Sequence, residues 1–289
     1  MKERLLTAAV GIPLALAIVI ASAWIPWVMY GALIILCLIG VFEALRTAGA
    51  DKNKILYVPC FLYASIVMVA PFFDLAAVIL PASLVFLFVM FAILLKKHET
   101  LRIETLCTAM ILTMFVSFPF MAIELIFSNI VPPDDSAAAY SCGVAMVAYC
   151  IIVSWVADGG AYFVGRALGK HKLAPVISPK KTIEGAVGGF ITSIVISLAC
   201  AYVYSDVLHC LPWDLNYVNL AVISGICIIM SMFGDISFSA IKRQYGIKDF
   251  GNLMPGHGGV LDRFDSVLFV CPTFYLLQFV LPILNITQP

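Results

Sequence analysis

The segment AAVILPASLVFLFVMFAILL, residues 76–95, decides the fold class of this chain. It contains no charged side chain and no glycine. An α-helix rises 1.5 Å per residue, so about 20 apolar residues cover the roughly 30 Å hydrocarbon core of a bilayer. The segment therefore predicts a transmembrane helix.

Similar apolar runs recur along the chain, and they predict an all-α, polytopic integral membrane protein with about nine transmembrane helices. The composition agrees, because 63% of the 289 residues are hydrophobic and 12% are charged. A soluble domain carries about one quarter charged residues. The mean hydropathy is +1.05, and no room is expected for a soluble domain. The expected spans are residues 5–23, 27–45, 55–73, 76–95, 105–127, 143–165, 185–205, 217–240 and 266–285.

The positions of the basic residues predict the orientation. With the N-terminus inside, all 17 Lys and Arg fall on the inner side, in the N-terminal end or in inner connections, and the outer connections carry acids such as Asp74 and Asp134. This is the positive-inside pattern. We therefore expect a multi-pass protein of the cell (inner) membrane, with its N-terminus and its site on the cytoplasmic side. Glu43 and Glu124 lie near expected helix ends, where carboxylates reach water, and no role is assigned to them.

The polar chemistry gathers in the second half, so residues 1–142 are expected to form N-terminal transmembrane helices and residues 143–289 the part that carries the site. Asp158 and Asp235 lie within expected spans, roughly 12 and 10 Å from the inner boundary at 1.5 Å per residue. A carboxylate at such depth faces a polar cavity or pairs with a cation. Either residue alone also fits an interhelical ion pair, but two carboxylates at similar depth on the same side favour a shared polar cavity.

The eighth expected span and the connection after it combine acids, cations and glycines. Asp235, Ser239 and Lys242 are spaced at i, i+4 and i+7, which places them on one helix face. Gly258 and Gly259 then allow backbone amides to approach an anion, and Asp262 and Asp265 follow. Carboxylates beside phosphate-binding cations are typical of Mg²⁺ sites. No pattern of His and Cys supports zinc.

Residues 178–185, with the sequence SPKKTIEG, predict a second anion-binding element. Ser178 and Pro179 resemble a helix start, and Lys180, Lys181 and Thr182 come directly before an apolar span. Helix N-terminal amides and lysines together bind anions. The alternative is that these two lysines are ordinary positive-inside flanks.

The pattern formed by these residues resembles the signature of the phosphatidate cytidylyltransferases, also called CDP-diacylglycerol synthases, of the bacterial type. The residues that carry the resemblance are Ser239-x-x-Lys242-Arg243-x4-Lys248-Asp249-x7-His257-Gly258-Gly259-x-x-Asp262-Arg263-x-Asp265, together with residues 178–185 and Asp158-Gly159-Gly160. Ile183 departs from the family, where an aromatic residue is common.

The resemblance implies condensation of CTP with phosphatidate to CDP-diacylglycerol and pyrophosphate in phospholipid synthesis. It implies Mg²⁺ held by Asp235 and Asp262, with Asp265 as a further catalytic carboxylate that supports these ligands or binds a second metal. A monovalent cation such as K⁺ is expected as a second ion. Lys181 is expected to be catalytic and to bind triphosphate. The family suggests a homodimer, and no nucleic-acid partner is expected. The remaining residues expected to bind substrate are Ser178, Lys180, Thr182, Ser239, Lys242, Arg243, Lys248, Asp249, His257, Gly258, Gly259 and Arg263.

Two alternatives remain open at this point. A CTP-dependent polyprenol or phytol kinase would have a similar topology and nucleotide site. A transporter would use Asp158 and Asp235 as ion-binding carboxylates within the membrane. The products formed from labelled CTP would separate these three functions.

Overall fold

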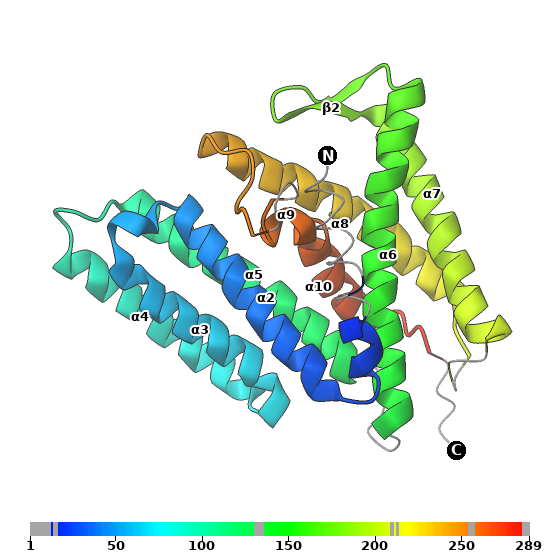
Figure 1. The fold of residues 1–289 in the computed structure, drawn as a ribbon, viewed down its shortest axis with the longest axis horizontal. Coiled ribbons are helices and arrows are strands. Elements are labelled where there is room, and N and C mark those ends of the chain that lie inside the picture. The colour runs from blue at the N-terminus through cyan, green and yellow to red at the C-terminus, as the bar shows by residue number, and fades with distance from the viewer. Residues whose placement is uncertain are drawn as a thin grey trace. The chain divides into compact units, whose positions relative to one another are not determined.

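A computed structural model of the chain describes residue 13 and residues 17–129, 136–208, 211, 214–253 and 258–284 (Figure 1). It divides into two compact units. The first contains residues 1–125 and 244–264, and the second contains residues 126–243 and 265–289. Both units are thus built from segments that are distant in the sequence. The sequence-based division at residue 142 stays a prediction.

The first unit is a layer of antiparallel apolar helices. Helix α2 (Pro26–Thr47) packs on α3 (Tyr57–Val69), and α3 packs on α4 (Ile79–Lys96). Helix α5 (Ile103–Asn129) belongs to this unit over most of its length. Short 3₁₀ turns at Ala50–Lys52, Lys54–Leu56, Pro71–Phe73 and Ala76–Val78 connect the helices. The four-residue helix α9 (Leu261–Phe264) completes the unit and contacts α2.

The second unit is built around the pair α6 (Ser136–Leu168) and α7 (Ile183–Tyr202), which pack along their length (Figure 1). The approach is close because Gly185 and Gly189, at i and i+4 on α7, face the backbone of α6. A methyl group at either position would collide with the carbonyl oxygen of Ala161 or Ala157. Small residues allow such contact between membrane helices. A π-helical turn (Val203–Val207), α8 (Tyr217–Gln244) and α10 (Val267–Leu277) complete the unit.

Seven helical segments of the described residues are long and apolar enough to cross a membrane. They correspond to the second through eighth expected spans, so the multi-pass, essentially all-helical fold is confirmed. The count of nine was too high for this part of the chain. The ninth expected span is the 11-residue helix α10, which covers only about 17 Å at 1.5 Å per residue. It ends at Leu277, and Pro282 follows shortly after. Most of the first expected span lies outside the described residues.

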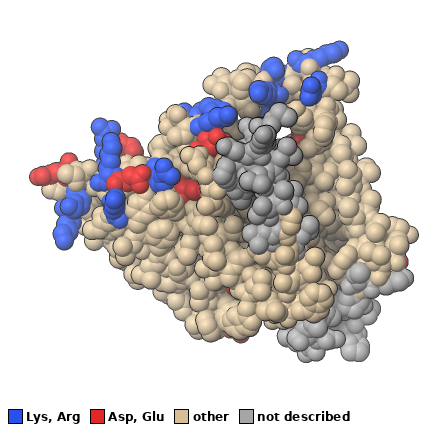
Figure 2. All heavy atoms as spheres, in the orientation of Figure 1, with Lys and Arg blue, Asp and Glu red and all other residues tan. Residues whose placement is uncertain are grey.

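Charged side chains are scarce over the helices seen in Figure 2. In the first unit they gather at the end where α2 leads to α3 and α4 leads to α5 (Figures 1 and 2). Exposed Arg46, Lys52, Lys54, Lys96, Lys97 and Arg102 belong to these connections. The connection between α3 and α4 lies at the opposite end and carries Asp74. This alternation within one unit agrees with the predicted partition of charge, while the orientation in the cell stays a prediction.

The segment before α7 differs from its prediction. Ser178 and Pro179 do not start a helix, because β2 (Ser178–Thr182) pairs with β1 (Lys172–Ala174) in an antiparallel hairpin. Lys172 lies opposite Thr182, and Ala174 lies opposite Ser178. The helix begins after Thr182, whose hydroxyl accepts a hydrogen bond from the amide of Gly185 at 3.1 Å. An N-cap of this kind sets the first residue of the helix.

Candidate functional site

The second unit brings together two site residues that were predicted from separate segments. The ammonium of Lys181, on β2, forms an ion pair with the carboxylate of Asp235, on α8. Their side chains are 26% and 25% exposed. The pair is therefore largely shielded from water but still open to a ligand.

Two more carboxylates interact electrostatically with this pair. Asp158 of α6 experiences the charges of Asp235, Asp265 and Lys181. The hydroxyl of Ser266 donates a hydrogen bond to Asp158 at 3.1 Å. Asp265 precedes α10, and burial, followed by the negative charge of Asp235, raises the pKa of its carboxyl to about 6. Lys181 thus lies beside an acidic cluster, which we define as Asp158, Asp235 and Asp265.

The hairpin that carries Lys181 is anchored at its base. The carboxylate of Glu184, in the first turn of α7, accepts hydrogen bonds from the amides of Lys170 and His171 at 3.0 and 3.2 Å. It also contacts Nδ1 of His171 at 2.6 Å. The amide of Ile183 donates to the carbonyl of His171 at 2.9 Å. These bonds join the chain just before β1 to the first turn of α7, and β2 continues directly into that helix. Both ends of the hairpin are thus fixed at the helix start, and Lys181 lies next to it.

The other predicted binding residues of this unit lie on the same elements. Ser239 and Lys242 share α8 with Asp235, and Lys242 interacts electrostatically with Asp265. Arg243 is exposed, and its Nε donates to the carbonyl of Ile177 in the hairpin at 3.4 Å. Ser178 is half-buried and Lys180 is exposed on β2. Cationic groups from the hairpin and from the end of α8 therefore flank the acidic cluster.

The first unit contains the rest of the predicted signature. Asp262 is 9% exposed, and its Oδ2 accepts hydrogen bonds from the amides of Phe250 and Gly259 at 2.7 and 3.0 Å. Gly258 has a φ of +87°, a backbone conformation that favours glycine. Lys248, Asp249 and Arg263 are exposed. His257 lies outside the described residues. The predicted sharing of a metal by Asp262 and Asp235 stays a prediction.

Glu43 is a residue whose environment was wrongly predicted. It was expected to reach water near a helix end, but it is 3% exposed. Its two carboxylate oxygens accept hydrogen bonds from the amides of Val260 and Leu261 at 3.0 and 2.9 Å. The available signal was a carboxylate in an apolar helix, which is costly unless it is paired. The sequence offered no way to find partners more than 200 positions away.

The donor set of the second unit fits Mg²⁺ that arrives with a substrate. Among the described residues, no three His, Cys, Asp or Glu side chains converge closely enough to hold a metal by themselves. Mg²⁺ usually takes one or two carboxylates and completes its shell with water and substrate phosphates. Asp235, in the acidic cluster, supplies hard oxygen donors of this kind.

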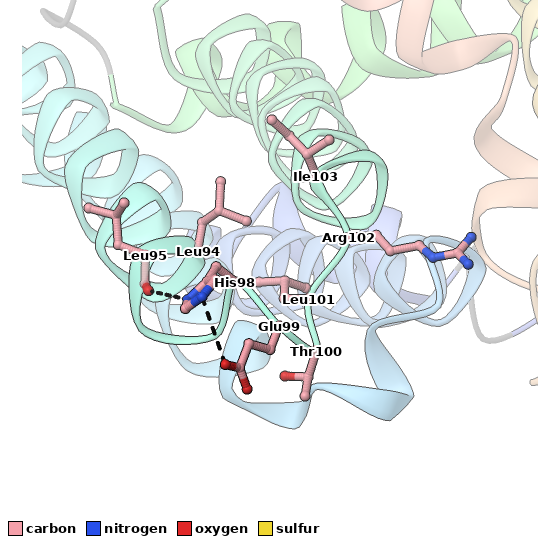
Figure 3. A pocket seen from close by; sticks show the side chains of 8 residues that line it. All are labelled: Leu94, Leu95, His98, Glu99, Thr100, Leu101, Arg102 and Ile103. Atoms are coloured by element: carbon pink, nitrogen blue, oxygen red, sulfur yellow. Dashed lines mark hydrogen bonds and ion pairs between the residues drawn. The ribbon is translucent and has the colours of Figure 1, made fainter.

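A hollow of about 500 Å³ lies elsewhere in the first unit. Figure 3 shows the eight residues that line it, which come from the end of α4, the connection after it and the first residue of α5: Leu94, Leu95, His98, Glu99, Thr100, Leu101, Arg102 and Ile103. His98 contacts the carbonyl of Leu95 at 3.2 Å and the carboxylate of Glu99 at 4.0 Å, so local contacts account for its polar groups. None of the predicted site residues belongs to this hollow. It is the surface of a helix connection rather than part of the candidate site.

Fold and site together define a multi-pass membrane protein that places lysines beside carboxylates of its apolar helices. The chain belongs to the cytidylyltransferase family, which matches residues 2–281. It is similar to phosphatidate cytidylyltransferases of three bacteria. Identity is 48% over 135 residues with the protein of Bacillus subtilis strain 168, covering 47% of this chain and 48% of the relative.

The other two relatives give similar values. Identity is 44% over 138 residues with the protein of Staphylococcus aureus strain COL, covering 47% of this chain and 49% of the relative. It is 44% over 140 residues with that of Staphylococcus haemolyticus, covering 48% and 51%. The chain thus spans about half the length of the curated relatives it matches.

Proposed function

We propose that the protein is a phosphatidate cytidylyltransferase. An ionised phosphate oxygen of phosphatidate attacks the α-phosphorus of CTP, and the bond from that phosphorus to the bridging oxygen of pyrophosphate breaks. The products are CDP-diacylglycerol and pyrophosphate. The attacking oxygen already carries negative charge near neutral pH, so the reaction needs no general base.

The observation that carries this proposal is the meeting of Lys181 with the acidic cluster. Lys181, Asp158 and Asp265 are residues on which the family resemblance rests. Two substrates rich in phosphate bring several negative charges into one site, and transfer between them depends on positioning and charge stabilisation. Lysines beside carboxylates serve both needs, since the lysines bind phosphate oxygens and the carboxylates bind the accompanying cation.

Lys181 has two partners in the proposed cycle. Without nucleotide it pairs with Asp235. A bound triphosphate offers Lys181 a larger negative charge than Asp235 does. When Lys181 moves from Asp235 to the triphosphate, the carboxylate of Asp235 becomes available to bind a cation. Asp235 and Asp262 are the proposed ligands of Mg²⁺, which when bound would offset charge on the triphosphate and on the leaving pyrophosphate. Lys242, Arg243, Lys248 and Arg263 share the remaining phosphate contacts.

Asp235 lies seven residues before Lys242 on α8, or about 10 Å along the helix axis. A site recessed by that distance suits a substrate whose acyl chains remain in the membrane while its phosphate meets a nucleotide from the cytosol. The proposed location is therefore the cytoplasmic face of the cell membrane. The homodimer and the monovalent cation stay predictions based on the resemblance.

Incubation of the purified protein with CTP labelled in its α-phosphate and with phosphatidate tests the proposal. Labelled lipid-linked cytidine, with release of unlabelled pyrophosphate, is the expected result. A polyprenol or phytol kinase would instead release labelled CDP, and with γ-labelled CTP it would form a labelled prenol phosphate. If neither labelled nucleotide is converted, both enzyme functions are contradicted and the transporter is the remaining alternative. A mock purification from membranes that lack the protein serves as the control for contaminating enzymes.

A further inference from the structure

Glu43 of α2 occupies an unusual position for a carboxylate in an apolar helix. It is almost fully buried, in the helix turn before the end of α2. Burying a carboxylate in such a place is costly, so a retained one needs strong partners. Its partners are two consecutive backbone amides, those of Val260 and Leu261. Both belong to the segment that carries Asp262 and Arg263.

The two amides start α9, so no carbonyl within that helix is available to them. A carboxylate that accepts both at once fixes the direction of the backbone at this point, and hydrogen bonds to an ionised acceptor are about twice as strong as neutral ones. The preceding amide, of Gly259, donates to Asp262 at 3.0 Å. Three successive amides thus point to two carboxylates.

The surrounding packing leaves Glu43 in contact with the segment from several sides. A Cβ atom at Gly251 or Gly259 would collide with its carboxylate. One turn earlier on α2, Gly40 leaves room for the side chain of Leu261, which is fully buried. The ring of Phe264 packs against Phe120 of α5 with a centroid distance of 5.6 Å. The segment is therefore docked through both its backbone and its side chains.

We propose that Glu43 is a positioning residue for the reaction. It holds residues 258–263 against α2 so that Asp262 and Arg263 are presented in one conformation. Its effect on turnover rests on the proposed function, because it is for that reaction that Asp262 and Arg263 are assigned. Its effect on the backbone does not depend on that assignment.

Amide hydrogen exchange measured by mass spectrometry tests the backbone effect directly. In Glu43→Gln one carboxylate oxygen is replaced by an NH₂ group. This group is a hydrogen-bond donor and would face a backbone amide, which is also a donor. Exchange in peptides covering residues 258–263 should accelerate by about tenfold or more, as expected for loss of a charge-assisted hydrogen bond. Glu43→Asp keeps the charge and should restore part of the protection. Glu124→Gln, the same change at a buried carboxylate of α5, should leave this peptide unchanged.

Gly251→Ala provides a second route to the same result without removing the carboxylate. Its methyl group would push Glu43 from its place, so the same peptide should exchange faster. Gly31→Ala, on α2 with open space around it, is the matched control and should behave as wild type. Under the proposed function, kcat/KM for CTP should fall roughly 100-fold in Glu43→Gln, the order of effect that a misplaced group produces.

Two outcomes would overturn the proposal. Unchanged exchange at residues 258–263 in both Glu43→Gln and Gly251→Ala would show that Glu43 does not hold the segment. Faster exchange throughout α2, α3 and α5, or failure of both variants to fold, would make Glu43 a residue of general stability. If wild type forms no CDP-diacylglycerol, the proposed function fails while the exchange measurement still decides the role of Glu43.

Discussion

The ammonium of Lys181 and the carboxylate of Asp235 form an ion pair that joins the β1–β2 hairpin to α8. The two residues are 54 positions apart in the sequence. Both side chains keep about a quarter of their surface exposed, so the pair is more shielded than a surface salt bridge and yet open to a competing anion. Four predictions follow, two on the members of this pair, one on Asp262 and one on Thr182, the N-cap of α7.

Lys181→Ala should lower kcat/KM for CTP by about 100-fold, because one phosphate contact that strengthens in the transition state is worth roughly 3 kcal/mol. Steady-state kinetics with varied CTP would measure it. Lys172→Ala is the matched control, since it removes the same charge from the exposed strand β1. Equal activity of Lys181→Ala and wild type would leave Lys181 as a topological flank.

Asp235→Asn should abolish activity without unfolding the protein. The change breaks the ion pair with Lys181, which is partly exposed, but it also relieves repulsion among the carboxylates of the acidic cluster. Because these two effects oppose each other, the thermal midpoint without Mg²⁺ should stay within a few degrees of wild type. The rise in midpoint that Mg²⁺ with CTP causes in wild type should disappear. Asp74→Asn, in an exposed connection, should keep that rise. A variant that retains the Mg²⁺ response would contradict the assignment of Asp235 as a ligand.

Asp262→Asn should behave differently from Asp235→Asn. Its Oδ2 accepts two backbone amides, and a neutral amide oxygen accepts more weakly than a carboxylate. We expect a loss of about 1 to 2 kcal/mol in the free energy of unfolding together with loss of activity. Denaturant unfolding in detergent would measure the first quantity. Undiminished stability would show that these amide contacts contribute little.

Thr182→Ala should lower the free energy of unfolding by about 1 kcal/mol, the usual contribution of an N-cap. It should also lower activity, because the cap sets the start of α7 and Lys181 is the residue directly before the cap. Thr182→Ser keeps the hydroxyl and should retain most of both properties. If Thr182→Ser loses as much as Thr182→Ala, the methyl group matters rather than the cap.

Much of the fold could be predicted because it depends on composition in consecutive residues. An apolar run of about 20 residues has few structures available other than a helix across the bilayer, since every backbone polar group must be satisfied within the segment. Residues 76–95 are such a run. The spacing of Asp235, Ser239 and Lys242 likewise follows from helical periodicity alone. The seven spanning helices of the described residues were therefore determined by the sequence itself, as was the placing of these three candidate site residues along one helix face.

The tertiary structure decided how those residues meet. Residues 178–182 form a strand because β1 offers hydrogen bonds, and no local period distinguishes that strand from a helix start. The end of the chain forms only the short α10, although its composition favoured a full span. Glu43 is buried because amides 217 and 218 positions later donate to it. Contacts between residues so far apart leave no periodic pattern in a single sequence, because they depend on which surfaces pack together in the folded chain.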